Sequence, residues 1–237
     1  MLYKFADFVF EINGVPSTVE KICSSYLCFE DLPIDFRIEL SEADVTYEIE
    51  KASSMGMPQI NYSNYYSLAL YRKICSKILN VDGFLLHGAV IEYEGRGHLF
   101  TAKSGTGKTT HIRLWQSFFG EDKVTIVNGD KPIIRFIDGK FYAYGTPWCG
   151  KEGYNCNKRV ELSDICFIER DHANSIYKLS DTEAFPRLYS QIMIDDSSNL
   201  ARQLELCDLL IQKVPMYLLK CNRELEAVKV AYDTIGR

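Results

Sequence analysis

The residues best suited to chemistry lie together in one short segment, Ser104-Gly105-Thr106-Gly107-Lys108-Thr109-Thr110. An apolar run precedes this segment, and a stretch with helical periodicity follows it to about Phe118. A glycine-bearing loop between a strand and a helix lets successive backbone N–H groups surround phosphate oxygens, and the positive end of the helix adds to this anion site. In such a loop Lys108 reaches the β- and γ-phosphates and the Thr109 hydroxyl binds Mg²⁺. The segment therefore predicts a nucleoside triphosphate site to which all seven residues contribute.

One position departs from the strict pattern G-x-x-x-x-G-K-[ST], because Ala102 stands where the first glycine is expected. Alanine requires more room around the backbone, but Gly105, Gly107, Lys108 and Thr109 match the pattern. The alternative interpretation is a glycine-rich turn that binds nothing. The order of strand, loop, Lys-Thr-Thr and helix favours the phosphate site.

Transfer of a phosphoryl group also needs a carboxylate that holds the metal and a group that orients the nucleophile. Asp130 ends the apolar run that begins at Val124, and we expect a parallel neighbouring strand to bring it close to Thr109 and the metal. Glu169 ends the apolar run Cys166–Ile168 and is a second candidate for the metal or the substrate. For both carboxylates the alternative is a polar strand end that faces water. The sequence thus predicts a metal site of Thr109, Asp130 and Glu169.

Two further residues join Asp130 as predicted catalytic residues, His87 and Lys151. His87 lies in the apolar run Phe84–Ile91, which we expect to form a strand beside the one that leads into the glycine-bearing loop. It is either a hydrogen-bonded core residue or a group that acts in catalysis near neutral pH. Lys151 follows a glycine-rich loop, and such a loop can close over a phosphate and place a cation on the transferring charge. In the same loop, Trp148 either stacks on a base or anchors the loop to the core.

The composition excludes several classes of partner and site. The chain of 237 residues has a formal net charge of −5 and scattered basic residues, so neither nucleic acid nor a membrane surface is expected as a partner. The first residues lack the layout of a signal peptide, and no apolar run is long enough to cross a bilayer. The eight cysteines show neither C-x-x-C spacing nor a zinc-ligand pattern, which is typical of free thiols in a reducing compartment. We therefore expect a cytoplasmic protein.

The rest of the sequence predicts an α/β fold, a mixed sheet with flanking helices, that positions these residues. Residues 1–60 are expected to form a strand-rich N-terminal section packed on a core of residues 61–237, in one compact unit. A helix is predicted over Asn64–Leu79, and the C-terminal part after Glu169 is expected to be mainly helical. Besides Phe84–Ile91 and the strand that leads into the glycine-bearing loop, the predicted strands are Tyr3–Ile12, Phe36–Leu40, Val45–Ile49, Val124–Asp130, Ile133–Ile137, Lys140–Tyr144, Ile165–Ile168 and Met216–Lys220.

The order of these segments resembles that of the HPr kinase/phosphorylase and phosphoenolpyruvate carboxykinase group of P-loop proteins. The segments that carry the resemblance are Leu86–Val90, Ser104–Thr110 and Val127–Pro132. Small HPr-kinase-related proteins with a Gly-Thr-Pro-Trp-x-Gly-Lys segment are also similar, here over Gly145–Lys151. The resemblance covers roughly residues 84–170 and does not extend to residues 1–60.

This resemblance implies a P-loop-containing, HPr-kinase-like mixed sheet and an ATP- and Mg²⁺-dependent kinase. The γ-phosphate is then transferred to a hydroxyl, commonly that of a serine, on a peptide, a protein or a small metabolite. The family's base and metal site correspond to Asp130, and its histidine corresponds to His87. The resemblance further implies self-association into a homo-oligomer.

The chain departs from the family pattern at one position that bears on catalysis. HPr kinases have two adjacent aspartates where this chain has Gly129-Asp130. Asp130 then serves both as base and as metal ligand, another residue substitutes, or transfer is weak. Two other classes of function stay open: a nucleotide hydrolase or switch with water as its acceptor, and a nucleotide-binding sensor without catalysis.

Overall fold

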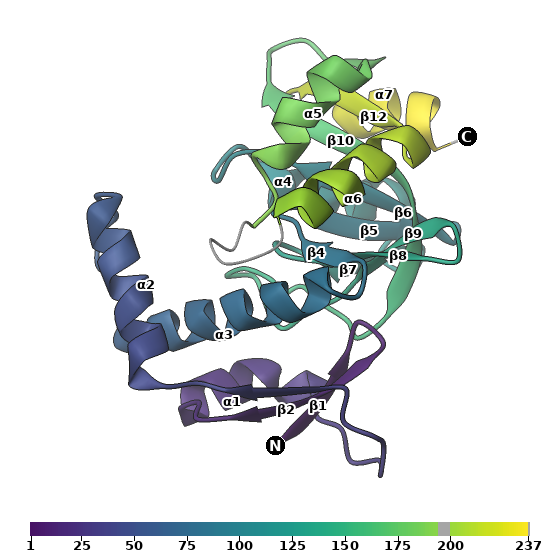
Figure 1. The fold of residues 1–237 in the computed structure, drawn as a ribbon. Helices are drawn as coiled ribbons and strands as arrows, with labels where there is room; N and C mark the ends of the chain where they lie inside the picture. The colour runs from purple at the N-terminus through teal and green to yellow at the C-terminus, as the bar shows by residue number, and fades with distance from the viewer. Residues whose placement is uncertain (194–199, 237) are drawn as a thin grey trace.

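The N-terminal part of the chain forms a small sheet of its own. The computed structural model describes residues 1–193 and 200–236. The three strands of the small sheet are β1 (Leu2–Phe5), β2 (Phe8–Asn13) and β3 (Phe36–Glu39), with β1 antiparallel and β3 parallel to β2. Helix α1 (Ser17–Cys23) and a short 3-10 helix, Ser24–Tyr26, connect β2 to β3 (Figure 1).

Helix α3 (Tyr62–Leu79) joins this small sheet to the rest of the molecule. It lies between the small sheet and the large one, as Figure 1 shows. One hydrophobic core contains side chains from both sheets and from α3, among them Phe5, Phe10, Leu70, Ile74, Ile78, Leu85 and Ile133. The predicted helix over Asn64–Leu79 is therefore confirmed, and its apolar face binds the N-terminal section to the sheet that carries the predicted site.

The prediction of a strand over Val45–Ile49 is wrong, because these residues lie in helix α2 (Glu42–Ser54). A capping box begins the helix: the side chains of Ser41 and Asp44 each accept a hydrogen bond from the other residue's backbone N–H. Val45 and Glu48 are both buried, with the three-residue spacing of one helix face. The apolar alternation that suggested a strand was outweighed by this start signal.

Among the described residues, nine strands form the large sheet, which mixes parallel and antiparallel pairs. Its main path runs in the order β4-β8-β9-β10-β6-β5-β7, and β12 continues from β10 with β11 beside it. The long strand β10 pairs with β9 near its start and with β6 and β12 further along, so the sheet curls around it. The strands are β4 (Gly83–Leu85), β5 (Ala89–Tyr93), β6 (Arg96–Thr101), β7 (Val124–Asn128), β8 (Ile133–Ile137), β9 (Lys140–Tyr144), β10 (Arg159–Arg170), β11 (Ser175–Lys178) and β12 (Met216–Cys221).

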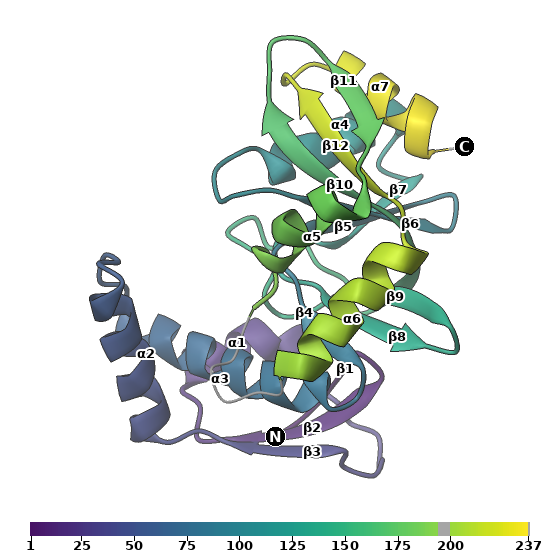
Figure 2. The ribbon, with the colours of Figure 1, turned by 45° about the horizontal axis from the view of Figure 1, so that its top comes forward.

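Helices cover both faces of the large sheet and confirm the mixed α/β architecture. On one face, α5 (Asp181–Tyr189) and α6 (Leu200–Lys213) pack on a core that includes Leu99, Ile165 and Leu218. Figure 2 shows these two helices in front of the sheet. On the other face, α4 (Lys108–Phe119) and α7 (Glu226–Ile235) enclose a second core around Trp115.

The pairing of three strands sets the position of the predicted site. Strand β5 lies between β6 and β7 and is antiparallel to both, with Ala89 opposite Phe100 and Val90 opposite Asn128. The start of β5 and the ends of β6 and β7 consequently meet at one edge of the sheet. The expectation that Asp130 follows a parallel neighbour of the strand leading into the loop is wrong, since β5 separates β7 from β6.

Several smaller features differ from the predictions or complete them. The run Phe84–Ile91 is interrupted at His87 and Gly88, so it forms β4 and β5 rather than one strand. Strand β11 lies in a stretch expected to be helical. The hairpin of β8 and β9 is confirmed, and none of the eight cysteines forms a disulfide. Within residues 1–193 and 200–236, no helix combines the length and apolar character that crossing a bilayer requires.

Candidate functional site

Four charged or polar side chains meet at the sheet edge where β5 starts and β6 and β7 end. Lys108 Nζ lies 2.9 Å from His87 Nε2 and donates to the carbonyl oxygen of Ala102 at 3.1 Å. His87 Nε2 is 3.4 Å from Asp130 Oδ1, and Lys131 Nζ is 3.5 Å from Asp130 Oδ2. We call His87, Lys108, Asp130 and Lys131 the His87 cluster. The structure therefore brings together three of the residues singled out in the sequence and adds Lys131.

The turn after β7 places Asp130 in this cluster. Asn128 is fully buried, and its Oδ1 accepts hydrogen bonds from the backbone N–H groups of Asp130 (2.9 Å) and Lys131 (2.8 Å). An asparagine that binds the backbone two residues onward is a recurrent turn former. Its Nδ2 donates to Thr146 in turn. The Asp130 carbonyl accepts the N–H of Gly88 at 2.8 Å, which ties this turn to the start of β5.

The charges of the cluster favour an ionised carboxylate. Partial burial opposes the ionisation of Asp130, but the adjacent His87 ring and the positive charges of Lys131 and Lys108 outweigh it, so the pKa of Asp130 is lowered. Burial lowers the pKa of Lys108, while the nearby Asp130 acts in the opposite direction. A carboxylate kept ionised next to a partly desolvated ammonium is a local charge arrangement that can bind an anion and a metal together.

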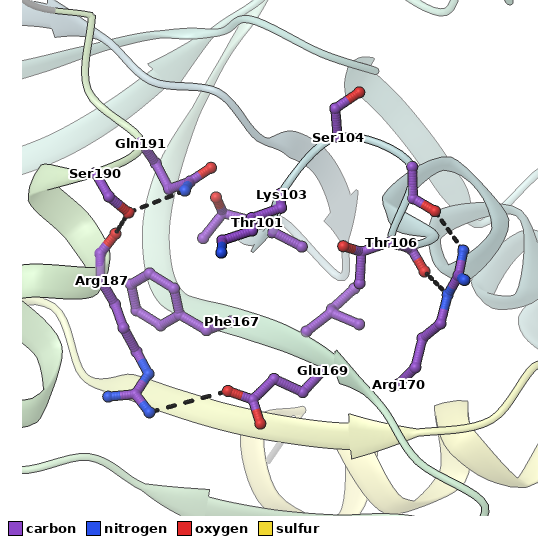
Figure 3. Close-up of a pocket in the computed structure, with 13 residues that line it drawn as sticks. Thr101, Lys103, Ser104, Thr106, Phe167, Glu169, Arg170, Arg187, Ser190 and Gln191 are labelled. Atoms are coloured by element: carbon purple, nitrogen blue, oxygen red, sulfur yellow. Dashed lines mark hydrogen bonds and ion pairs between the residues drawn. The ribbon is translucent and has the colours of Figure 1, made fainter.

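The loop of residues 102–107, which joins β6 to α4, has the backbone that its glycines allow. Gly105 has φ +77° and Gly107 has φ +129°, conformations that residues with a Cβ rarely adopt. Arg170, at the end of β10, donates to the carbonyl oxygens of Thr106 (2.8 Å) and Gly105, as Figure 3 shows. These two hydrogen bonds hold the loop against the end of β10.

A cavity of about 710 Å³ opens beside this loop. Figure 3 shows its lining: the loop on one side, the end of β10 with Phe167 and Glu169 on another, and the end of α5 on the third. Arg187 Nη2 lies 3.9 Å from Glu169 Oε1 across the cavity wall. Ala102 and Gln191 belong both to this lining and to the hydrogen bonds of the His87 cluster. The cluster therefore borders the cavity.

The remaining predicted residues are distributed around this cavity. Ser104, Gly105 and Thr106 line it, whereas Thr109 is half-buried and Thr110 exposed in the first turn of α4. Glu169 is exposed on the cavity wall, apart from Asp130 among the described ion pairs and hydrogen bonds. Lys151 is exposed in the turn of residues 150–153. That turn approaches the cluster, because a Cβ on Gly150 would lie 3.4 Å from the Cβ of Asp130.

The structure leaves little room for a side chain at position 129. A Cβ at Gly129 would lie 2.8 Å from the carbonyl oxygen of Cys149, and the Gly129 N–H donates to the carbonyl of Tyr154 at 2.8 Å. The loop that follows β9 fills the place of a side chain at position 129. Trp148 of this loop is buried, donates from Nε1 to Ser67 Oγ at 3.0 Å and packs on Tyr71. Of its two predicted roles, it therefore has that of an anchor to the core.

Some residues of the site were not predicted from the sequence. Lys131 follows Asp130 directly and could have been included on that ground. Gln191 and Ser190 offer no signal in the sequence, because they reach His87 only through the packing of α5 against the sheet. Arg170 and Arg187 are likewise identified by their place on the cavity wall alone.

A second group of polar side chains is buried where α4 packs on β6 and β10. His98 Nδ1 and Asp164 Oδ2 are 2.7 Å apart and fully buried, and the His98 ring stacks on Trp115. Trp115 Nε1 donates to His111 Nε2 at 3.1 Å. Burial lowers the pKa of His111 to about 3, and burial raises the pKa of Asp164 although His98 opposes this. We call His98, His111, Trp115 and Asp164 the His98 cluster.

The donors present at the sheet edge suit a hard cation. Among residues 1–193 and 200–236, no three His, Cys, Asp or Glu side chains gather closely enough to form a metal site by themselves. Mg²⁺ is usually held by one or two carboxylates together with substrate phosphates and water, so a protein-only cage is not required. The Asp130 carboxylate and the Thr109 hydroxyl are oxygen donors of the kind that Mg²⁺ prefers.

The comparisons with known proteins do not assign the chain to a family. No protein-family model matches it, and no curated protein sequence matches it. Among solved structures, the HPr(Ser) kinase/phosphatase from Coxiella burnetii is similar over 63% of this chain and 94% of that chain, with 10% sequence identity and a TM-score of 0.36. A TM-score of this size assigns neither a family nor an activity.

Proposed function

We propose that this protein is an ATP- and Mg²⁺-dependent kinase that transfers the γ-phosphate to a hydroxyl of a peptide, a protein or a small metabolite. The observation that carries the proposal is the position of Lys108. It is the first residue of α4, follows a glycine-bearing loop, and contacts His87 beside the ionised Asp130 at the border of a cavity. A cation, a carboxylate and a ring nitrogen thus lie at the N-terminus of a helix, where phosphate binds favourably.

In this proposal the loop and the start of α4 bind the triphosphate. The backbone N–H groups of residues 104–108 surround the phosphates, and Lys108 contacts the transferring group. Thr109 and Asp130 are the proposed ligands of Mg²⁺, whose chemistry is to neutralise charge on the β- and γ-oxygens. Glu169 is a further proposed ligand for metal or substrate, because it is exposed on the cavity wall.

The bonds and the proton of the proposed transfer can be followed through the groups of this cluster. The acceptor oxygen forms a bond to the γ-phosphorus while the bond from that phosphorus to the bridging oxygen breaks, and the bond electrons leave with ADP. The hydroxyl proton passes to a base of the cluster, Asp130 or His87, and from there to solvent. Lys151 is proposed to approach the transferring charge, since its turn passes close to Asp130 at Gly150, where an added Cβ would lie 3.4 Å from the Asp130 Cβ.

The test follows the label of γ-labelled ATP with Mg²⁺. Separate reactions contain a serine-containing peptide pool, HPr and an extract of small metabolites, with the parent protein and the variants Lys108→Ala and Asp130→Asn. Each variant should lower transfer at least about 100-fold, because each removes a group that acts on the developing charge. Asp138→Asn, the same change in the turn between β8 and β9, is the matched control and should leave transfer unchanged.

The three possible outcomes distinguish the candidate functions. Label that moves to one pool, and is lost in both site variants, supports the kinase and identifies the class of its acceptor. Release of free phosphate alone, lost in the same variants, overturns the kinase in favour of a nucleotide hydrolase or switch. ATP that binds without being converted in any pool overturns it in favour of a nucleotide sensor.

A further inference from the structure

A chain of hydrogen bonds from the end of α5 determines the orientation of the His87 ring. Ser190 Oγ donates its single hydrogen to the carbonyl oxygen of Arg187 at 2.7 Å. The same oxygen is 3.0 Å from the side chain of Gln191, as Figure 3 shows. Because the hydroxyl hydrogen is already used, the Gln191 group facing Ser190 must be the donating amide nitrogen. The amide oxygen of Gln191 is therefore turned away from Ser190.

That oxygen faces His87. Gln191 Oε1 lies 3.1 Å from His87 Nδ1, and an amide oxygen can only accept. Nδ1 therefore carries a hydrogen, and in the neutral ring Nε2 carries a lone pair. Nε2 on the opposite side of the ring has two neighbours. Nζ of Lys108, whose ammonium has donors and no acceptor, is nearer at 2.9 Å, whereas Oδ1 of Asp130, which can only accept, is farther away at 3.4 Å. The shortest contact of each ring nitrogen thus favours the same tautomer, Nδ1–H with a bare Nε2.

The backbone holds the ring in this place as well. The N–H of His87 donates to the carbonyl of Gln191 at 2.8 Å, and Met193 donates to Leu85 at 3.1 Å, so the segment after α5 pairs with residues 85–87. The carbonyl of His87 accepts from Thr101 Oγ1 at 2.7 Å. These contacts fix the backbone of His87, and the Gln191 side chain adds control of its protonation site.

We propose that Gln191 and Ser190 are positioning residues that hold His87 in the Nδ1–H tautomer, so that its Nε2 lone pair accepts a hydrogen bond from the hydroxyl of the phosphoacceptor. This role rests on the proposed kinase function. In the free protein Lys108 occupies the lone pair. A triphosphate on the loop attracts the Lys108 ammonium and leaves Nε2 to the hydroxyl, which is thereby oriented only when the nucleotide is bound.

The tautomer can be measured without any enzymatic activity. Two-bond ¹⁵N–¹H correlation spectra of the histidine rings, recorded at about pH 8 where an unperturbed imidazole is neutral, distinguish a protonated nitrogen from a bare one. The His87 signals are identified by their loss in His87→Gln. The parent protein should have a protonated Nδ1 and a bare Nε2 at His87. A protonated Nε2 in the folded parent overturns the proposal.

Variants at the two positions test the control of the tautomer. Gln191→Leu removes the acceptor, and Ser190→Ala frees the amide to turn, so both should produce a mixture of the two tautomers at His87. Gln191→Glu keeps an acceptor toward Nδ1 and should keep the parent tautomer. The signals of the buried His98 and His111 serve as internal evidence that each variant is folded. An unchanged His87 tautomer in both Gln191→Leu and Ser190→Ala overturns the proposal.

The effect on catalysis is measured separately with the acceptor found for the parent. Gln191→Leu should lower kcat about tenfold, the low end of the effect seen when a residue that orients a metal-bound histidine is changed, with the KM for ATP unchanged. Gln191→Glu should restore part of the loss. A fall in kcat of equal size in both variants would mean a merely structural role and would contradict the positioning. If no protein transfers phosphate at all, the kinase is overturned, whereas the tautomer experiment still decides the hydrogen-bond chain.

Discussion

The His87 cluster lies at an edge of the large sheet and the His98 cluster lies where α4 packs on β6 and β10, and their environments differ. In the His87 cluster the side chains of His87, Asp130 and Lys131 are partly exposed and Lys108 is buried beside them, and every group has a partner of complementary character. In the His98 cluster the side chains are fully buried under α4, and His98 Nε2, His111 Nδ1 and Asp164 Oδ1 have no hydrogen-bond partner among the described residues.

This difference indicates what each cluster contributes. Polar groups that reach a cavity can exchange their partners for those of a ligand, so the His87 cluster is suited to binding and chemistry. Polar groups that are sealed in a core can only stabilise or destabilise the fold, since nothing reaches them. Changes in the first cluster should therefore alter activity, and changes in the second should alter the free energy of unfolding.

The largest effect on stability is expected from Asp164→Ala in the buried cluster. Among the described residues, Asp164 is the polar partner of the buried His98 side chain, and this change removes it. Breaking a buried pair costs about 3–5 kcal/mol of unfolding free energy. Urea denaturation measures this loss. Glu161→Ala on the same strand is the control, because the exposed ion pair of Glu161 with Lys140 is worth no more than about 1 kcal/mol. A loss at Asp164 as small as that of the control would remove the distinction between the clusters.

A smaller loss of unfolding free energy is expected from Gly129→Asp beside the His87 cluster. The added side chain meets the carbonyl of Cys149, and overpacking of this kind costs about 1–3 kcal/mol. Urea denaturation compares this variant with Ala173→Asp, an exposed position at which the change should stay within about 0.5 kcal/mol. The variant should not increase phosphate transfer. Higher transfer without loss of stability would show that the site lacks a second carboxylate for a reason other than space.

The smallest effect is a dependence of stability on pH that arises from His111. Its pKa is lowered by burial to about 3, below the value of an unfolded histidine, so the unfolded chain binds more protons between these two values. The contribution of neutral His111 to the unfolding free energy is then fully present above about pH 6.5. It falls on acidification by at most about 1.4 kcal/mol for each pH unit. Urea denaturation of His111→Gln between pH 7 and pH 5 should give a flatter dependence than the parent. His172→Gln, at an exposed position, is the control, and equal slopes in the parent and His111→Gln would contradict the prediction.

Local sequence predicted the parts of the site that lie on one continuous segment. The glycines of residues 104–107 fix the backbone before α4, and Asp130 follows the strand that the apolar run Val124–Val127 indicates. His87 was expected on a strand beside β6; β5 does pair with β6, but His87 itself lies just before it. The roles proposed for these residues stay predictions, because geometry alone does not measure binding.

Contacts between distant segments could not be predicted in the same way. Gln191 and His87 are far apart in the sequence and meet because the segment after α5 pairs with residues 85–87. Strand β5 lies between β6 and β7 and is antiparallel to both, and the sequence of one strand does not determine which strand lies beside it. Helix α2 was mistaken for a strand because its apolar residues fit both periods, and only the capping box of Ser41 and Asp44 distinguishes them.

The most direct test of the central claim is the equilibrium binding of ATP with Mg²⁺, measured by titration calorimetry. The parent protein should bind ATP, and Lys108→Ala should weaken binding at least about tenfold, equivalent to about 1.4 kcal/mol. Lys123→Ala, the same change in the turn after α4, should stay within about twofold of the parent. Equal affinity in the parent and Lys108→Ala, or no binding by the folded parent, would contradict the assignment of the His87 cluster to a nucleotide site.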